Sequence, residues 1–120
     1  MPEMPREILD LRDDLAQHGD QEVTVVAYLK PRSGKEEETR ELLFSLIEPT
    51  LVEPGCIQYA LYRSNDDPSV FMFFEIWRSK EDLDKHLTMP HLKPLYERKS
   101  DLLSEDIDVK LYTMASDSPE

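Results

Sequence analysis

The chain has 120 residues and a mass of 14.0 kDa, which is enough for one domain with a single core but not for two. Hydrophobic residues make up 39% and charged residues 33%, which argues against a disordered, collagen-like or low-complexity chain. The formal net charge of −12 repels phosphate backbones and anionic lipid headgroups, so we expect no nucleic-acid partner and no membrane partner.

Signals for export, membrane insertion and disulfide formation are missing from the sequence. The longest apolar runs, such as residues 70–74, are far shorter than the roughly 20 residues of a membrane-spanning helix. The N-terminus is acidic, whereas a signal peptide begins with basic residues. Cys56 is the only cysteine, which excludes an internal disulfide and a thiolate-rich metal site. These features predict a cytoplasmic protein.

Residues 1–21 are expected to form an N-terminal appendage with a short amphipathic helix, which ends before the Gly19-Asp20 pair. The apolar positions of this helix are Ile8, Leu11 and Leu15. Residues 115–120 are small and polar and are expected to form a flexible tail. The domain itself is therefore predicted over residues 22–114.

Two strands and a helix are predicted in the first half of the domain. Residues 23–30 are rich in β-branched and aromatic side chains, which favour a strand. A helix should follow, because Leu42, Leu43, Leu46 and Ile47 recur at helical period, and Pro49 should bend its last turn. The turn signal Glu53-Pro54-Gly55 precedes residues 57–62, whose alternation predicts the second strand.

The strongest predicted strand is residues 70–78, with Phe71, Phe73, Glu75 and Trp77 on one face and apolar residues on the other. Ser79 can cap the following helix, which Pro90 must interrupt. A further helix from residue 91 to about 103 is begun or kinked by Pro94, and the last strand is predicted at residues 107–114.

The order strand, helix, strand, strand, helix, strand predicts an α+β fold of the ferredoxin-like, split βαβ type, with an antiparallel sheet and helices on one side. Helices on one side cover only one face of the sheet, yet the third strand is apolar on both faces. A second copy packed sheet to sheet would bury the other face. We therefore predict a homodimer with an isologous interface.

The segment from Val25 through Leu95 resembles the antibiotic biosynthesis monooxygenase family, whose members are small dimeric α+β barrels. The matching pieces are Val25-Val26-Ala27, Gly34-Lys35-Glu36-Glu37, Glu53-Pro54-Gly55-Cys56 leading to Tyr59, Phe74-Glu75-Ile76-Trp77, and His86-Leu87 followed by Pro90-His91-Leu92. The resemblance covers about residues 23–112. It implies a cavity between the sheet and the helices, lined by the Trp77 face and the His86 helix.

Members of this family include oxygenases that convert aromatic polyketides or hydroquinones to quinones without a metal or flavin. Such an oxygenase needs a substrate that supplies the electrons, and a base that deprotonates it. The scattered glycines form no nucleotide-binding fingerprint, so we expect no cofactor, and the partners implied are oxygen and a small aromatic or quinol substrate. The candidate catalytic residues are His86 and Glu75, and the candidate substrate-binding residues are Trp77, Phe73, Tyr59 and His91.

Other functions of the fold remain open. Haem-degrading members carry an asparagine on the first strand, which residues 23–30 lack, and two polar donors of the polyketide branch correspond to Phe73 and Leu83 here. A quinol-type substrate fits better. No metal is expected, because His86 and His91 are separated by the helix break at Pro90. The alternatives are a non-catalytic dimeric ligand-binding domain, with His86 a structural core residue, or an isomerase or haem-binding member.

Overall fold

The computed structural model describes residues 4–16 and 21–116. The break expected at Gly19-Asp20 and residues 117–120 of the predicted tail lie outside the described residues. Within the described residues, no helix combines the length and the apolar character needed to cross a lipid bilayer.

Four strands form one antiparallel sheet in the order β2-β3-β1-β4. They are β1 (Val23–Leu29), β2 (Cys56–Arg63), β3 (Phe71–Trp77) and β4 (Asp108–Tyr112). The edge strand β2 carries one irregularity in its pairing with β3, between Cys56 and Gln58. Chain order and strand order together confirm the predicted α+β fold with a split βαβ topology.

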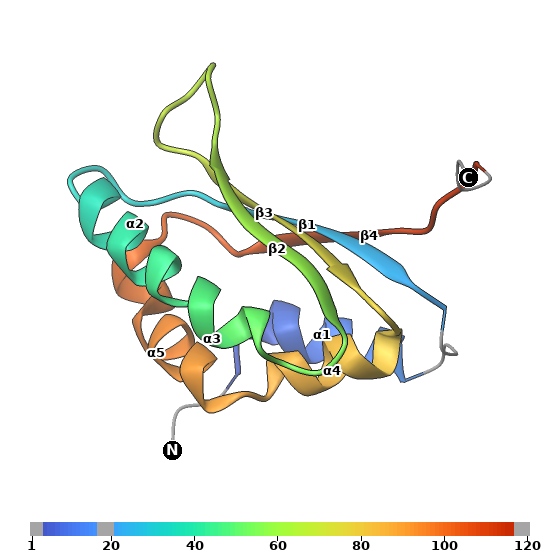
Figure 1. The fold of residues 1–120 in the computed structure, drawn as a ribbon. Helices are drawn as coiled ribbons and strands as arrows, with labels where there is room; N and C mark the ends of the chain where they lie inside the picture. Colours follow the sequence, from blue (N-terminus) through green and yellow to red (C-terminus); the bar gives the residue numbers. More distant parts are fainter. Residues whose placement is uncertain (1–3, 17–20, 117–120) are drawn as a thin grey trace.

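All of the helices lie on one side of this sheet (Figure 1). They are α1 (Arg6–Leu15), α2 (Glu36–Ser45), α3 (Ile47–Leu51), α4 (Lys80–Leu87), the short 3-10 helix η1 (Pro90–Leu92) and α5 (Lys93–Leu102). The single helix expected around Leu46 is divided into α2 and α3. The break follows from Pro49, which has no N–H to donate to the carbonyl of Ser45.

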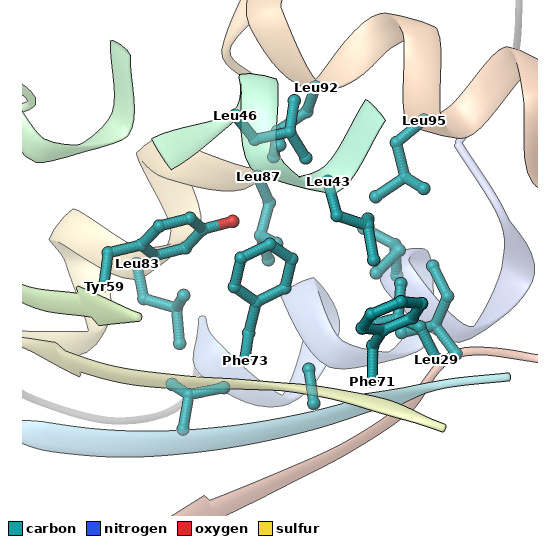
Figure 2. Close-up of a cluster of buried hydrophobic side chains, with 14 of the residues drawn as sticks. Leu29, Leu43, Leu46, Tyr59, Phe71, Phe73, Leu83, Leu87, Leu92 and Leu95 are labelled. Carbon is teal, nitrogen blue, oxygen red and sulfur yellow. The ribbon is translucent and has the colours of Figure 1, made fainter. Parts of the chain in front are cut away.

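The inner face of the sheet packs against the helices to form one hydrophobic core. Along β1 and β3, buried residues alternate with less buried ones, as the predicted period requires. Figure 2 shows Phe71 and Phe73 pointing from β3 toward Leu43 of α2 and Leu87 of α4. The one ionisable residue on this face of β3 is Glu75, which is only 5% exposed.

Within residues 4–16 and 21–116, no layer covers the outer face of the sheet (Figure 1). Its central residues Val26, Phe74 and Ile76 are half-buried, and Tyr62 is 50% exposed. The sequence predicted this unpaired apolar face, because one helical layer cannot cover both sides of a sheet.

Helix α1 packs into the core and does not trail from the domain. Ile8 and Leu15 are each 3% exposed, as deeply buried as residues of the sheet. Arg12 donates from Nε to Oδ1 of Asp84 on α4 at 2.7 Å, and from its terminal nitrogen to Oδ2 at 3.3 Å. On the other side of the helix, Glu7 pairs with Lys99 of α5 at 3.0 Å.

Two glycines with positive φ allow a matched test of packing at the Glu53-Pro54-Gly55 turn. A Cβ at Gly55, where φ is +86°, would lie 2.5 Å from Oδ2 of Asp82, whereas a Cβ at Gly34, where φ is +87°, meets nothing within 4 Å. We expect Gly34→Ala to destabilise the fold by about 1–2 kcal/mol through backbone strain. Gly55→Ala should lower the free energy of unfolding by about 3 kcal/mol or more, because a steric clash with Asp82 is added to the strain. Urea unfolding midpoints measure both, and equal midpoints would contradict the packing described.

Candidate active site

Three titratable side chains from segments far apart in the sequence lie close together near Trp77, the last residue of β3. Glu53 comes from the turn before β2, His86 from the last turn of α4, and His91 from η1. Pro90 ends the α4 helix and starts the 3-10 turn that returns His91 toward His86. The break at Pro90, expected from the sequence to keep the two histidines apart, instead brings them together on Glu53.

One carboxylate oxygen of Glu53 contacts both histidines. Oε2 of Glu53 lies 2.8 Å from Nδ1 of His86 and 2.8 Å from Nε2 of His91. The side chains of Glu53 and His86 are 5% and 3% exposed, and that of His91 is 22% exposed. The sequence predicted Glu53 only as part of a turn. No local signal marks its role, since the contact with His86 joins residues 33 positions apart.

The carboxylate fixes the tautomer of His86. A carboxylate only accepts hydrogen bonds, so Nδ1 of a neutral His86 carries the proton and donates a hydrogen bond to Glu53. The lone pair of the ring then resides on Nε2, which is the basic nitrogen. His86 also lines a cavity between sheet and helices, so a base is present in the wall of that cavity.

Aromatic rings hold His86 in place. The ring of Trp77 lies 4.6 Å from that of His86 between centroids, and Tyr59 meets His86 edge-on at 5.5 Å. Trp77 is fully buried and donates from Nε1 to Oε1 of Glu75 at 2.8 Å. It does not belong to the cavity wall. Trp77, a candidate substrate-binding residue in the sequence, thus packs behind His86 and Glu75 in this structure.

The cavity has a volume of about 50 Å³ and a mostly apolar wall. Its polar residues are Glu75, His86 and the phenols of Tyr59 and Tyr96. Tyr59 and Phe73, two of the predicted substrate-binding residues, line it and stack on each other at 4.6 Å. The third, His91, contacts Glu53 and Thr50 and lies outside the cavity wall. A wall of this kind places the base among mostly apolar side chains.

Glu75 is the other acid–base candidate in the cavity. Burial raises the pKa of its carboxyl above the ordinary value of 4.5, and the hydrogen bond from Trp77 and the nearby His86 oppose this shift. A raised pKa means that the folded protein binds this proton more tightly than the unfolded chain. Stability linked to Glu75 is therefore lost as the pH rises from 4.5 through the raised pKa.

We expect Glu75→Gln to stabilise the protein at pH 8, because the amide still accepts from Trp77 but carries no buried charge. The gain should shrink as the pH falls toward 4.5, where the carboxyl of the parent is protonated in both states. Urea unfolding of parent and variant between pH 4 and pH 8 measures the difference. Glu41→Gln, at an exposed position of α2, is the control, and a gain that does not vary with pH would refute the argument.

The residue types of the cluster are ones that can also bind a metal ion. Within the described residues, Glu53, His86 and His91 are the one group of three such side chains whose ligand atoms lie within 4.8 Å of one another. Two histidines and one carboxylate suit divalent transition metals. Asp82, which lies four residues before His86 on α4, is not part of this group, because it accepts from Arg78 at 2.8 Å and from Ser79 at 2.9 Å.

Cys56 lies close to this cluster but is a poor nucleophile. Burial, with the charges of Glu53 and Glu75, raises the pKa of its thiol to about 11. The thiolate is therefore scarce at neutral pH, and covalent catalysis through Cys56 is disfavoured.

Comparisons with known proteins agree with the fold and identify its family. The family model for antibiotic biosynthesis monooxygenase matches residues 22–98. The uncharacterised protein sll1783 of Synechocystis is 35% identical over 96 residues, which make up 80% of this chain and 65% of that protein. This chain thus spans just under two thirds of that relative's length.

Rv0793 of Mycobacterium tuberculosis is 36% identical over 87 residues, which cover 72% of this chain and 85% of that protein. The structure of Rv0793 matches with a TM-score of 0.77 at 31% identity, covering 82% of this chain and 100% of that one. The resemblance noted in the sequence is confirmed: this chain belongs to the antibiotic biosynthesis monooxygenase family.

Proposed function

We propose that this protein is a cofactor-independent monooxygenase that oxidises a small phenol or hydroquinone with molecular oxygen. Its family supports a monooxygenase-like role. The observation that carries the proposal is the 2.8 Å contact between Glu53 and His86, because it directs the basic nitrogen of His86 away from Glu53. The cavity beside His86 has a mostly apolar wall against which an aromatic ring can pack once that wall is displaced.

Deprotonation comes first in the proposed reaction. Nε2 of His86 accepts the phenolic proton, and the carboxylate of Glu53 stabilises the imidazolium that forms. The resulting anion is electron-rich enough to reduce oxygen. One oxygen atom forms a bond to a ring carbon, and the other leaves as water with the hydrogen displaced from that carbon and the phenolic proton. A phenol and oxygen thus give a quinone and water, and a hydroquinone gives a hydroxyquinone and water, with all electrons drawn from the substrate.

The remaining residues of the cavity hold and shield the substrate. Phe73 and Tyr59 provide flat apolar surface for a ring. Glu75, with its raised pKa, can donate a hydrogen bond to a second oxygen of the substrate while it remains protonated. In this proposal His91 acts through Glu53 and does not touch the substrate.

Oxygen uptake tests this function. Uncharged phenols and hydroquinones are supplied to the protein in an oxygen-electrode cell at pH 7, with the same mixture lacking protein as the control. We expect protein-dependent uptake with formation of a quinone chromophore, and no oxygen returned when catalase is added. Return of half of the oxygen would show hydrogen peroxide as product, and hence an oxidase. Absence of uptake across the panel would refute the proposal.

A second candidate function is binding of a small ligand without catalysis. The observation that favours it is the cavity volume of about 50 Å³, since a cavity that accepts a benzene ring measures about 150 Å³. Ligand binding without oxygen uptake would select this function. Turnover without oxygen would indicate an isomerase, and a Soret shift on adding haem would indicate a haem-binding protein.

We also propose that the working form is a homodimer joined through the outer face of the sheet. The half-buried Val26, Phe74 and Ile76 are central to that face, and the exposed Tyr28 and Tyr62 flank them. At about 25 cal/mol per Å² of apolar area, covering this face with a second copy stabilises a domain whose own core is small. The partners are then oxygen, a small aromatic substrate and a second chain.

A further inference from the structure

Helix α1 forms one wall of the cavity that holds His86 and Glu75. Its residues Ile8 and Leu11 line the cavity together with residues of the sheet and of α4 and α5. The helix spans Arg6–Leu15 and therefore lies before the segment matched by the family, residues 22–98. The helix therefore lies outside the segment that the family model matches, yet it reaches the proposed active site.

A surface groove of about 420 Å³ runs along the outside of this wall, between α1 and β4. The groove and the cavity share the side chains of Leu11, Ile107 and Val109. These three residues, which we name the gate, stand between solvent and the cavity at this point. Leu11 and Val109 are half-buried, so part of each residue is exposed to solvent.

Polar contacts hold α1 at the two sides of the gate. On one side Arg12 binds Asp84 of α4 at 2.7 Å. On the other, Glu7 accepts from Nζ of Lys99 at 3.0 Å and from the backbone N–H of Ile107 at 2.9 Å. The helix is thus held on both sides of Leu11, whose own side chain makes only apolar contacts with the core.

We propose that substrate enters the cavity from this groove through the gate, and that Leu11 limits the site to small, uncharged ring compounds. The inference rests on the proposed function for the identity of the site. The cavity of about 50 Å³ is well below the roughly 150 Å³ of a cavity that takes a benzene ring, so a ligand must displace part of the wall. The gate is the part of the wall that also lines the surface groove.

The charge of the groove sets a second limit on which ligands enter the cavity. The acidic residues that line the groove are Glu7, Asp10, Asp14 and Asp108. Among the described residues, no lysine or arginine lines it, although Arg6, Lys99 and Lys110 pair with Asp10, Glu7 and Asp108 from outside the lining. The chain as a whole carries a net charge of −12. This field repels a carboxylate or a phosphate ester and admits a neutral phenol. The phenol then loses its proton inside the cavity.

Anaerobic titration calorimetry tests the gate without turnover. The probes are phenol, 1-naphthol and 1-naphthoate, which compare one ring with two and a neutral ligand with an anion. We expect Leu11→Ala to raise the affinity for 1-naphthol relative to phenol by about tenfold, and Leu11→Trp to lower it by a similar factor. The control is Leu42→Ala, another half-buried leucine packed on the core but absent from the cavity wall, for which this ratio should not change.

A second pair of substitutions tests the charge limit at exposed positions where the fold is not at risk. Asp10→Asn combined with Asp108→Asn should raise the affinity for 1-naphthoate at low salt and leave that for 1-naphthol unchanged. The gate is overturned if Leu11→Ala and Leu42→Ala change the naphthol-to-phenol ratio equally, or if the parent binds naphthoate as tightly as naphthol. Selective binding without oxygen uptake would instead refute the proposed function and leave the gate intact.

Discussion

His86→Gln is expected to lower the turnover of a phenolic substrate by about 10²- to 10⁴-fold, the usual contribution of a positioned general base. Glutamine keeps a hydrogen-bonding group near Glu53 but offers no nitrogen that accepts a proton at neutral pH. The initial rate of oxygen uptake at saturating substrate measures the loss. Thermal melting of the variant shows whether the fold is retained, because His86 is buried between Trp77 and Tyr59.

Two companion variants separate a base from a metal centre. Glu53→Gln should lower turnover by about 10- to 100-fold, because the amide does not stabilise an imidazolium as a carboxylate does. His91→Gln should have a smaller effect on turnover, since His91 lies outside the cavity wall and contacts Glu53 rather than the cavity.

If the cluster instead holds a catalytic metal, all three substitutions remove a ligand and should abolish turnover alike. A chelator such as EDTA should then inactivate the parent. Equal losses in the three variants together with inactivation by EDTA would contradict the role of His86 as a metal-independent base.

Local patterns predicted most of the fold. The alternation along β3 and the helical period of α2 and α4 depend on neighbouring residues, and the structure confirms them. Ser79 caps α4 as predicted, accepting from the backbone N–H of Asp82 at 3.1 Å. These features follow from residues a few positions apart, whose interactions are set by backbone geometry alone.

The candidate site was predicted only in part, because its geometry depends on contacts between distant segments. The sequence singled out His86 and Glu75, and the structure places both in the cavity wall. It missed Glu53, which looks like an ordinary turn residue until the turn is packed against α4. It also named Trp77 as a candidate substrate-binding residue, whereas Trp77 is absent from the cavity lining, since sequence gives the face of a strand but not how far along it a cavity extends.

The role of α1 is a further feature that no local pattern could show. The spacing of Ile8, Leu11 and Leu15 predicted the helix itself. An amphipathic helix can pack on its own domain, on a partner or on nothing, and the same apolar stripe serves each case. Only the paired contacts of Arg12 with Asp84 and of Glu7 with Lys99 show where the helix lies.

Phe74→Glu is expected to convert the proposed dimer into a monomer. Phe74 lies on β3, which is an inner strand of the sheet, and its side chain is on the outer face between Val26 of β1 and Ala60 of β2. In a sheet-to-sheet dimer a glutamate here would be buried without a partner, once on each side of the symmetric interface. We expect the dissociation constant of the dimer to rise by about 100-fold or more, equivalent to about 3 kcal/mol.

Sedimentation velocity at micromolar concentration measures the outcome. The parent should sediment with twice the 14.0 kDa mass of one chain, and the variant with that of one chain. Val52→Glu is the matched control, since Val52 is 80% exposed in the turn after α3, away from the sheet face, and should leave the dimer intact. A parent that sediments as a monomer would contradict the proposal, because the apolar outer face would then be stable in water without a second layer.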